Sequence, residues 1–197
     1  GQVVQRLIDA GHEAHITVGG SIPTGSNTER DTILTPMGTT PRPRLPYAMQ
    51  LGSGTFDLLP GITYRGTREK FGWGAQYSAN VRTGKDNGYR LGNTHKFTAW
   101  ASYQPVVSLS GSARVQYVST ENINGIDATI ALPVQTADPN NYGGDVVNFL
   151  LGANWVGSGV LSKTRVAIEV GFPISRNLNG PQMETDLFLT GGLQIMF

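Results

Sequence analysis

Apolar and polar residues alternate along nine segments of the chain, which is the period-two pattern of β-strands with one apolar face. Most of these segments are ten to thirteen residues long. A common globular strand has about five or six residues, whereas a tilted strand needs about 9–11 to cross a bilayer. The pattern predicts an all-β protein with long strands at 2–8, 13–22, 53–65, 71–83, 94–104, 106–118, 146–156, 164–174 and 185–197.

The alternation divides each segment between two faces. Within 71–83, one face carries Phe71 and Trp73, and the other carries Gln76 and Arg82. A soluble β-sandwich and a membrane β-barrel both have one apolar face, so alternation alone does not separate them. The face opposite the apolar one holds the candidate functional residues, namely His15, Asp57, Arg65, Gln76, Arg82, Lys96, Trp100, Arg114, Asn148 and Glu169.

Short and long connections alternate strictly, so that all tight turns fall at one end of the predicted sheet. The short connections are 9–12, 66–70, the Gln104-Pro105 pair and 157–163, and the long ones are 23–52, 84–93, 119–145 and 175–184. Bacterial outer-membrane barrels have this arrangement, with short periplasmic turns and longer outer loops.

Aromatic residues provide a second, independent indication. On the apolar face, Phe56, Phe97 and Phe172 are among those near the long-loop end. A second set lies near the tight turns and is predicted to form an aromatic girdle of Tyr64, Phe71, Trp73, Tyr103, Trp155 and Phe197. Two rings of aromatics around an aliphatic band are typical of a membrane barrel, whereas a sandwich core would place large aromatics mid-strand. We therefore expect a transmembrane antiparallel β-barrel whose apolar face contacts outer-membrane lipid and whose polar face lines the lumen.

Composition limits the number of domains, the kinds of partner and the kinds of site that the chain can have. The 197 residues suit one domain, and a formal net charge of +1 argues against a nucleic-acid partner. The chain has no Cys, which removes disulfides and thiolate metal sites, while its 26 Gly suit many strands and turns. No stretch approaches eighteen consecutive apolar residues, so no transmembrane helix is expected.

The C-terminal segment and the strand count suggest a larger barrel. The chain ends on Phe197 after alternate apolar residues, which resembles the signal by which bacterial outer-membrane proteins are recognised for insertion. That resemblance implies the barrel-assembly machinery as a partner. Bacterial single-chain barrels have even strand numbers, so we expect residues 1–197 to be the C-terminal part of one barrel domain, with further strands upstream.

Several stretches resemble a family of bacterial outer-membrane transporters of the "MetA-pathway of phenol degradation" type. They are "SIPTGS" at 21–26, "LPYAMQLGSGTFDLLPGITYRG" at 45–66, "WGAQ" at 73–76, "NGYRLG" at 87–92 and "GPQMETD" at 180–186. The resemblance implies location in the outer membrane of a Gram-negative bacterium and a barrel of about twelve strands, about nine of them in this chain. It leaves the solute open, with aromatic compounds and metal-related solutes as candidates.

The charges on the polar face allow two interpretations. Arg65, Arg82, Lys96 and Arg114 fall on four successive strands, with Asp57 and Glu169 among them. They are either ordinary lumen residues that hydrate or salt-bridge the interior, or a basic ladder that selects anionic or polar solutes. Trp100 and Phe188 share this face, where they could form an aromatic constriction or contact a plug. Pro60 cannot donate to the ladder, so we expect a bulge at that position.

Catalytic and metal chemistry are weakly represented. His12 and His15 point to opposite faces and cannot share a metal. Ser108, Ser110 and Ser112 share the face of His15 on a different strand, but the chain has no G-x-S-x-G elbow. We expect no enzyme activity, no cofactor and no metal. The leading hypothesis is a channel or transporter passing small solutes. The alternative is a non-conducting structural or partner-docking barrel, with the Pro-rich 23–52 loop as an inward plug or a docking surface.

Overall fold

Nine strands form one continuous antiparallel sheet in the order β1-β2-β3-β4-β6-β7-β9-β10-β11. The computed structural model describes residues 3–9, 11–35, 37–130 and 134–196. All nine predicted segments are strands, which confirms the all-β prediction. They are β1 (Val3–Asp9), β2 (His12–Ser21), β3 (Phe56–Arg68), β4 (Phe71–Thr83), β6 (Thr94–Val106), β7 (Leu109–Thr120), β9 (Gly144–Val156), β10 (Thr164–Leu178) and β11 (Phe188–Ile195).

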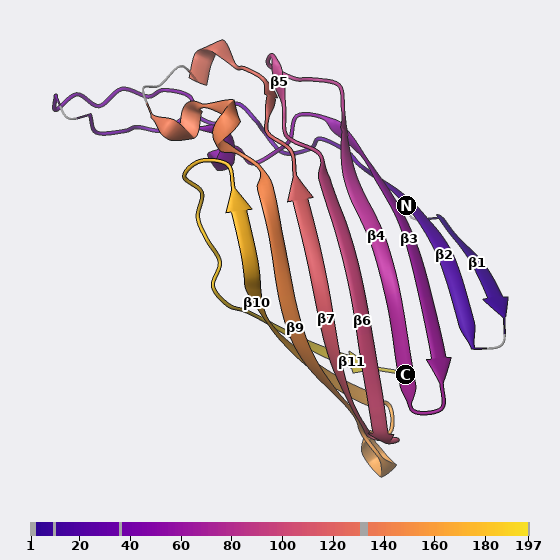
Figure 1. The fold of residues 1–197 in the computed structure, drawn as a ribbon. Coiled ribbons are helices and arrows are strands. Elements are labelled where there is room, and N and C mark those ends of the chain that lie inside the picture. The colour runs from indigo at the N-terminus through magenta and orange to yellow at the C-terminus, as the bar shows by residue number, and fades with distance from the viewer. Residues whose placement is uncertain (1–2, 10, 36, 131–133, 197) are drawn as a thin grey trace.

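The sheet is long and curved, with its tight turns at one end (Figure 1). Each strand pairs with the neighbours that the connections predict, but β1 and β11 do not pair with each other. Within the described residues the sheet is therefore open and does not close on itself. None of the helices in this described part of the chain is long and apolar enough to cross a membrane.

Two local expectations about proline were wrong. The turn between β6 and β7 lies after Val106, not at Gln104-Pro105, because Pro105 is accommodated in a register irregularity between Tyr103 and Val106. At Pro60 the ladder to β4 is interrupted without the expected bulge, since Leu58 and Gly61 keep the same register with their partners. A proline lacks the N–H that the ladder requires, and an interruption satisfies this constraint as well as a bulge does.

The apolar face of the sheet is uncovered. Side chains from strands across the sheet are about half exposed, including Ile16 (51%), Leu151 (47%) and Ile168 (54%). The other sheet in the described residues has two short strands, β5 (Tyr89–Arg90) and β8 (Asn124–Gly125). No second layer therefore buries the apolar face, and the β-sandwich alternative does not describe this fold.

The hydrophobic core lies outside the main sheet, in a loop cap that we define as the connections 22–55, 84–93 and 121–143. Five of the seven buried apolar residues of the described chain lie here, namely Tyr47, Tyr89, Ile123, Ile130 and Ala137. The Tyr47 ring meets the Tyr89 ring edge-on at 4.7 Å between centroids. Short 3-10 helices shape these connections: η1 (Tyr47–Met49), η2 (Ala128–Ile130), η3 (Gln135–Ala137) and η4 (Pro139–Asn141), while η5 (Gly159–Leu161) lies in a turn at the opposite end.

A buried ion pair joins two of the cap connections. Arg44 and Asp127 approach to 2.7 Å, and both side chains are almost fully buried. The Arg44 guanidinium also donates to the Asn27 carbonyl and to the Thr129 hydroxyl. The Asp127 backbone N–H donates to the Tyr47 hydroxyl at 3.0 Å. These contacts connect residues about eighty positions apart, so the cap is a packed unit and not a set of independent loops.

The cap predicts an alkaline transition. Burial raises the pKa of Tyr47, Tyr89 and Tyr142 above the ordinary tyrosine value, which is about 10. Above that value the unfolded chain loses phenolic protons that the folded cap retains, so cap stability falls as pH rises through the raised pKa values. Absorbance titration at 295 nm should show a late-ionising component equivalent to these three tyrosines. Tyr89→Phe should reduce that component by the amplitude of one tyrosine. A folded wild-type protein without the late-ionising component would contradict the packing of the cap.

Candidate functional site

The cross-strand register places all ten candidate residues on the same face of the sheet. Gln76 lies opposite Thr98, Ser78 opposite Lys96, and Trp100 opposite Arg114. The same register continues to His15, Asp57 and Arg65 on one side and to Asn148 and Glu169 on the other. The structure therefore brings residues from seven strands together as one polar face.

Most of the cations on this face are paired. Arg82 binds Asp57, which is almost fully buried and also accepts a 2.8 Å hydrogen bond from Thr55. Arg65 binds Glu13, and Arg114 lies 2.9 Å from Glu169. Glu13 was not among the predicted residues, although it lies directly opposite Arg65 in the register.

These pairs leave only one of the four cations of the predicted basic ladder without a carboxylate among the described residues. Arg65–Glu13 and Arg82–Asp57 join neighbouring strands, whereas Arg114 on β7 reaches across β9 to Glu169 on β10. The salt-bridged alternative describes the three arginines. Lys96 differs, because it makes no ion pair or hydrogen bond with the described residues.

Trp100 and Phe188 make no ring contact with each other in the described part of the chain. Each ring covers a glycine directly opposite on the neighbouring strand, Trp100 over Gly74 and Phe188 over Gly171. A Cβ at either glycine would overlap the ring. Aromatic cover of strand glycines keeps apolar area against the sheet and helps to hold the register.

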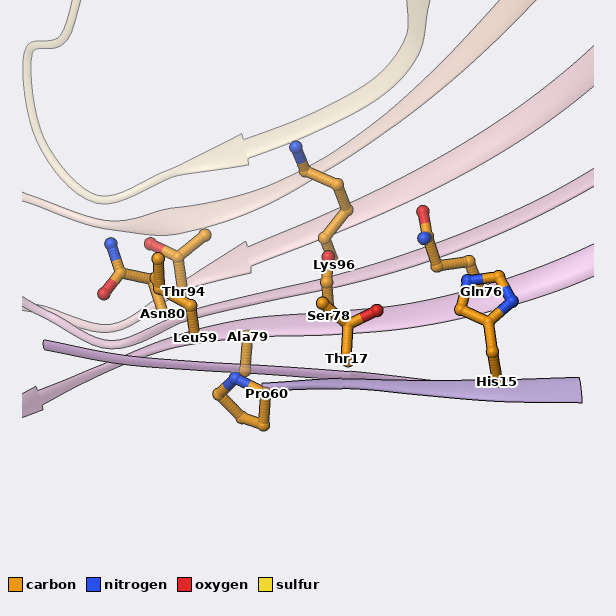
Figure 2. Close-up of a pocket in the computed structure, with 11 residues that line it drawn as sticks. His15, Thr17, Leu59, Pro60, Gln76, Ser78, Ala79, Asn80, Thr94 and Lys96 are labelled. Atoms are coloured by element: carbon orange, nitrogen blue, oxygen red, sulfur yellow. The ribbon is translucent and has the colours of Figure 1, made fainter. Parts of the chain in front are cut away.

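A polar hollow of about 610 Å³ lies over β2, β3, β4 and β6. Figure 2 shows Lys96, Ser78 and Thr17 rising from the same side of the sheet, with His15 and Gln76 nearby. Gln76 donates to Thr63 at 2.9 Å. The remaining polar members of the hollow are Asn80 and Thr94.

A second hollow, of about 450 Å³, lies between the polar face and the connection 179–187. Arg176 on β10 binds Glu184 and Asp186 of this connection and holds it near the sheet. Gln182 and Met183 line the hollow together with Asn148. The 23–52 loop contributes Arg44 and the Tyr47 ring to the loop cap, and its role as a plug or a docking surface stays a prediction.

The register places the described members of the predicted aromatic girdle on the apolar face near the tight turns. The Phe71 and Tyr103 rings lie 4.8 Å apart between centroids in a tilted arrangement, and the Tyr64 hydroxyl lies 2.6 Å from His12 Nδ1. Trp73 covers Gly66 and Trp155 pairs with Val166. Phe197 lies outside the described residues. Among the described residues there is no group of three or more His, Cys, Asp or Glu that could hold a metal ion.

Comparison with known proteins adds no identification, because no protein-family model and no curated protein matches the chain. The fold and the polar face define an all-β protein built on one large antiparallel sheet with two unlike faces. The family resemblance noted from sequence remains a prediction.

The buried Asp57–Arg82 pair yields a testable difference in stability. Asp57→Ala leaves the Arg82 guanidinium without its carboxylate and should lower the free energy of unfolding by about 3–5 kcal/mol. Glu169→Ala breaks a more exposed pair and should cost only about 0–1 kcal/mol. Urea titration of the folded protein measures both. Equal costs would show that burial does not distinguish the two pairs, and Asp57→Ala with Arg82→Ala should recover part of the loss.

Proposed function

We propose that this chain forms part of the wall of a transmembrane β-barrel in the outer membrane of a Gram-negative bacterium, and that the barrel passes small solutes. The observation that carries the proposal is the uncovered apolar face. Monomeric soluble proteins rarely expose contiguous apolar patches above a few hundred Å², whereas here exposed aliphatic side chains recur on strand after strand, including Val18, Leu58, Val115 and Leu193.

Strand geometry supports a bilayer as the surroundings of this face. The six strands β3, β4, β6, β7, β9 and β10 have 12 to 15 residues each. A tilted strand needs about 9–11 residues to cross the hydrocarbon core. The extra residues place strand ends and girdle aromatics at the interfaces.

The sheet edges support a larger assembly. The outer edges of β1 and β11 present backbone groups with no ladder partner among the described strands. Such edges cannot face lipid, because unpaired N–H and C=O groups are costly there. Further strands of the same barrel satisfy this requirement. We propose that the barrel-assembly machinery recognises the C-terminal strand during insertion.

The polar face supports passage of solute. Its paired arginines, amides and hydroxyls can contact water, and the ion pairs allow charges to lie on a wall that also faces low-dielectric lipid. The resemblance to outer-membrane transporters supports the same assignment.

Lipid contact is tested by placing a charge on each face at one depth. Leu151→Arg puts a guanidinium on the apolar face and should lower the free energy of unfolding in vesicles by about 2–4 kcal/mol if the position lies at the midplane. Ser112→Arg is the control. Ser112 lies directly opposite Gly152, which follows Leu151 on β9 and pairs with Glu169 on β10, so it lies at the same depth but on the polar face. We expect little loss there. Equal losses at both positions would contradict the assignment of faces.

Conduction is tested by planar-bilayer recording of the purified full-length protein. We expect discrete channel openings in salt solution. The absence of conductance from folded, inserted protein would contradict transport and favour the non-conducting structural barrel.

A further inference from the structure

The polar hollow differs from the rest of the polar face because several of its side chains have no hydrogen bond or ion pair within the part of the chain that the structure describes. Elsewhere on that face, the arginines form ion pairs and Asn148 donates to Gln116. In the hollow, Lys96, Ser78, Thr17 and His15 make no side-chain hydrogen bond or ion pair with the described residues. Four polar groups on β2, β4 and β6 thus remain available to one ligand.

Asn80 supplies a second, independent observation. Its Oδ1 atom is buried and has no hydrogen-bond partner in the structure. A ligand cannot reach this atom, but the Nδ2 atom of the same amide also has no hydrogen-bond partner among the described residues and points to the same side of the sheet as the Lys96 ammonium (Figure 2). Asn80 is one of the residues that line the hollow. Asn80 follows Ser78 by two residues on β4, and Ser78 lies opposite Lys96. Residues two apart on a strand share a face at a spacing of about 7 Å.

We propose that this hollow binds a small organic monocarboxylate that also carries a hydroxyl group. The Lys96 ammonium binds the carboxylate, with the Ser78 hydroxyl as a further donor, and the solute hydroxyl accepts a hydrogen bond from Asn80 Nδ2. This inference rests on the proposed function, because it assigns a solute class to the polar face. It does not require the barrel to conduct.

The charges around the hollow determine which solute it prefers. Lys96 is the one member of the predicted cation set left without a carboxylate, while Asp57 and Glu169 are held by Arg82 and Arg114. One free ammonium balances one carboxylate, and a dianion would keep an unbalanced charge in the hollow. The neutral amide and hydroxyl groups of the hollow should bind a solute more tightly when it has hydrogen-bonding groups besides its carboxylate.

The test compares 3-hydroxybutyrate with butyrate, which differ by one hydroxyl. Isothermal titration calorimetry on the full-length protein, folded in detergent micelles, gives both affinities. We expect 3-hydroxybutyrate to bind about 3- to 10-fold more tightly, as one neutral hydrogen bond provides. Asn80→Ala should remove this preference and leave butyrate binding unchanged. Lys96→Gln should weaken both ligands by about 10- to 100-fold, as expected for the loss of a charged hydrogen bond.

Lys163→Gln is the matched control, because Lys163 lies at the tight-turn end outside the hollow, and it should bind as the wild type does. Unchanged affinities in folded Lys96→Gln would overturn the proposal, as would inorganic phosphate binding as tightly as 3-hydroxybutyrate. Equal affinity of the wild type for the two carboxylates would overturn the role of Asn80. Failure to conduct would instead contradict the proposed transport, since calorimetry needs no open channel.

Discussion

The pleat of the strands places successive side chains on opposite sides of the sheet, and the two sides of this sheet need opposite surroundings. One side exposes Ile62, Leu151 and Ile168, and the other holds the Arg82–Asp57 pair. A register slip of one residue would exchange these sets and put charges among the aliphatic side chains. The glycines covered by Trp73, Trp100 and Phe188 oppose such a slip, because each ring fits only over the residue directly across from it.

This division explains why the packed core lies in the loops. A single sheet with no second layer has little interior of its own, and only Ala79 and Leu150 are buried apolar residues on its described strands. The cap therefore obtains its own order from the Tyr47 and Tyr89 rings and from the Arg44–Asp127 pair. Its connection 121–143 also binds the 179–187 connection through the Asn179–Asn122 contact. Four long connections are thereby linked at one end of the sheet.

Charge on the polar face is controlled by register as well. Arg65 and Arg82 each lie directly opposite a carboxylate, so pairing follows from the alignment of β2, β3 and β4. Lys96 lies opposite Ser78 and Val118, neither of which carries charge. The strand alignment therefore leaves Lys96 without a carboxylate partner. For this reason we expect a carboxylate ligand to bind more tightly in the hollow than elsewhere on this face.

The sequence by itself determined the nine strands, their order and the two faces, because side-chain period, turn length and aromatic placement are local features that the chain displays without folding. The same local signals placed His15, Lys96 and the other candidate residues on one side of the sheet. Only the tertiary structure decided which charges meet, that Glu13 neutralises Arg65, and that Trp100 lies on Gly74. It also decided that the 23–52 loop packs with residues about eighty positions away. Such contacts depend on the register between strands and on packing between distant loops, which no local pattern encodes.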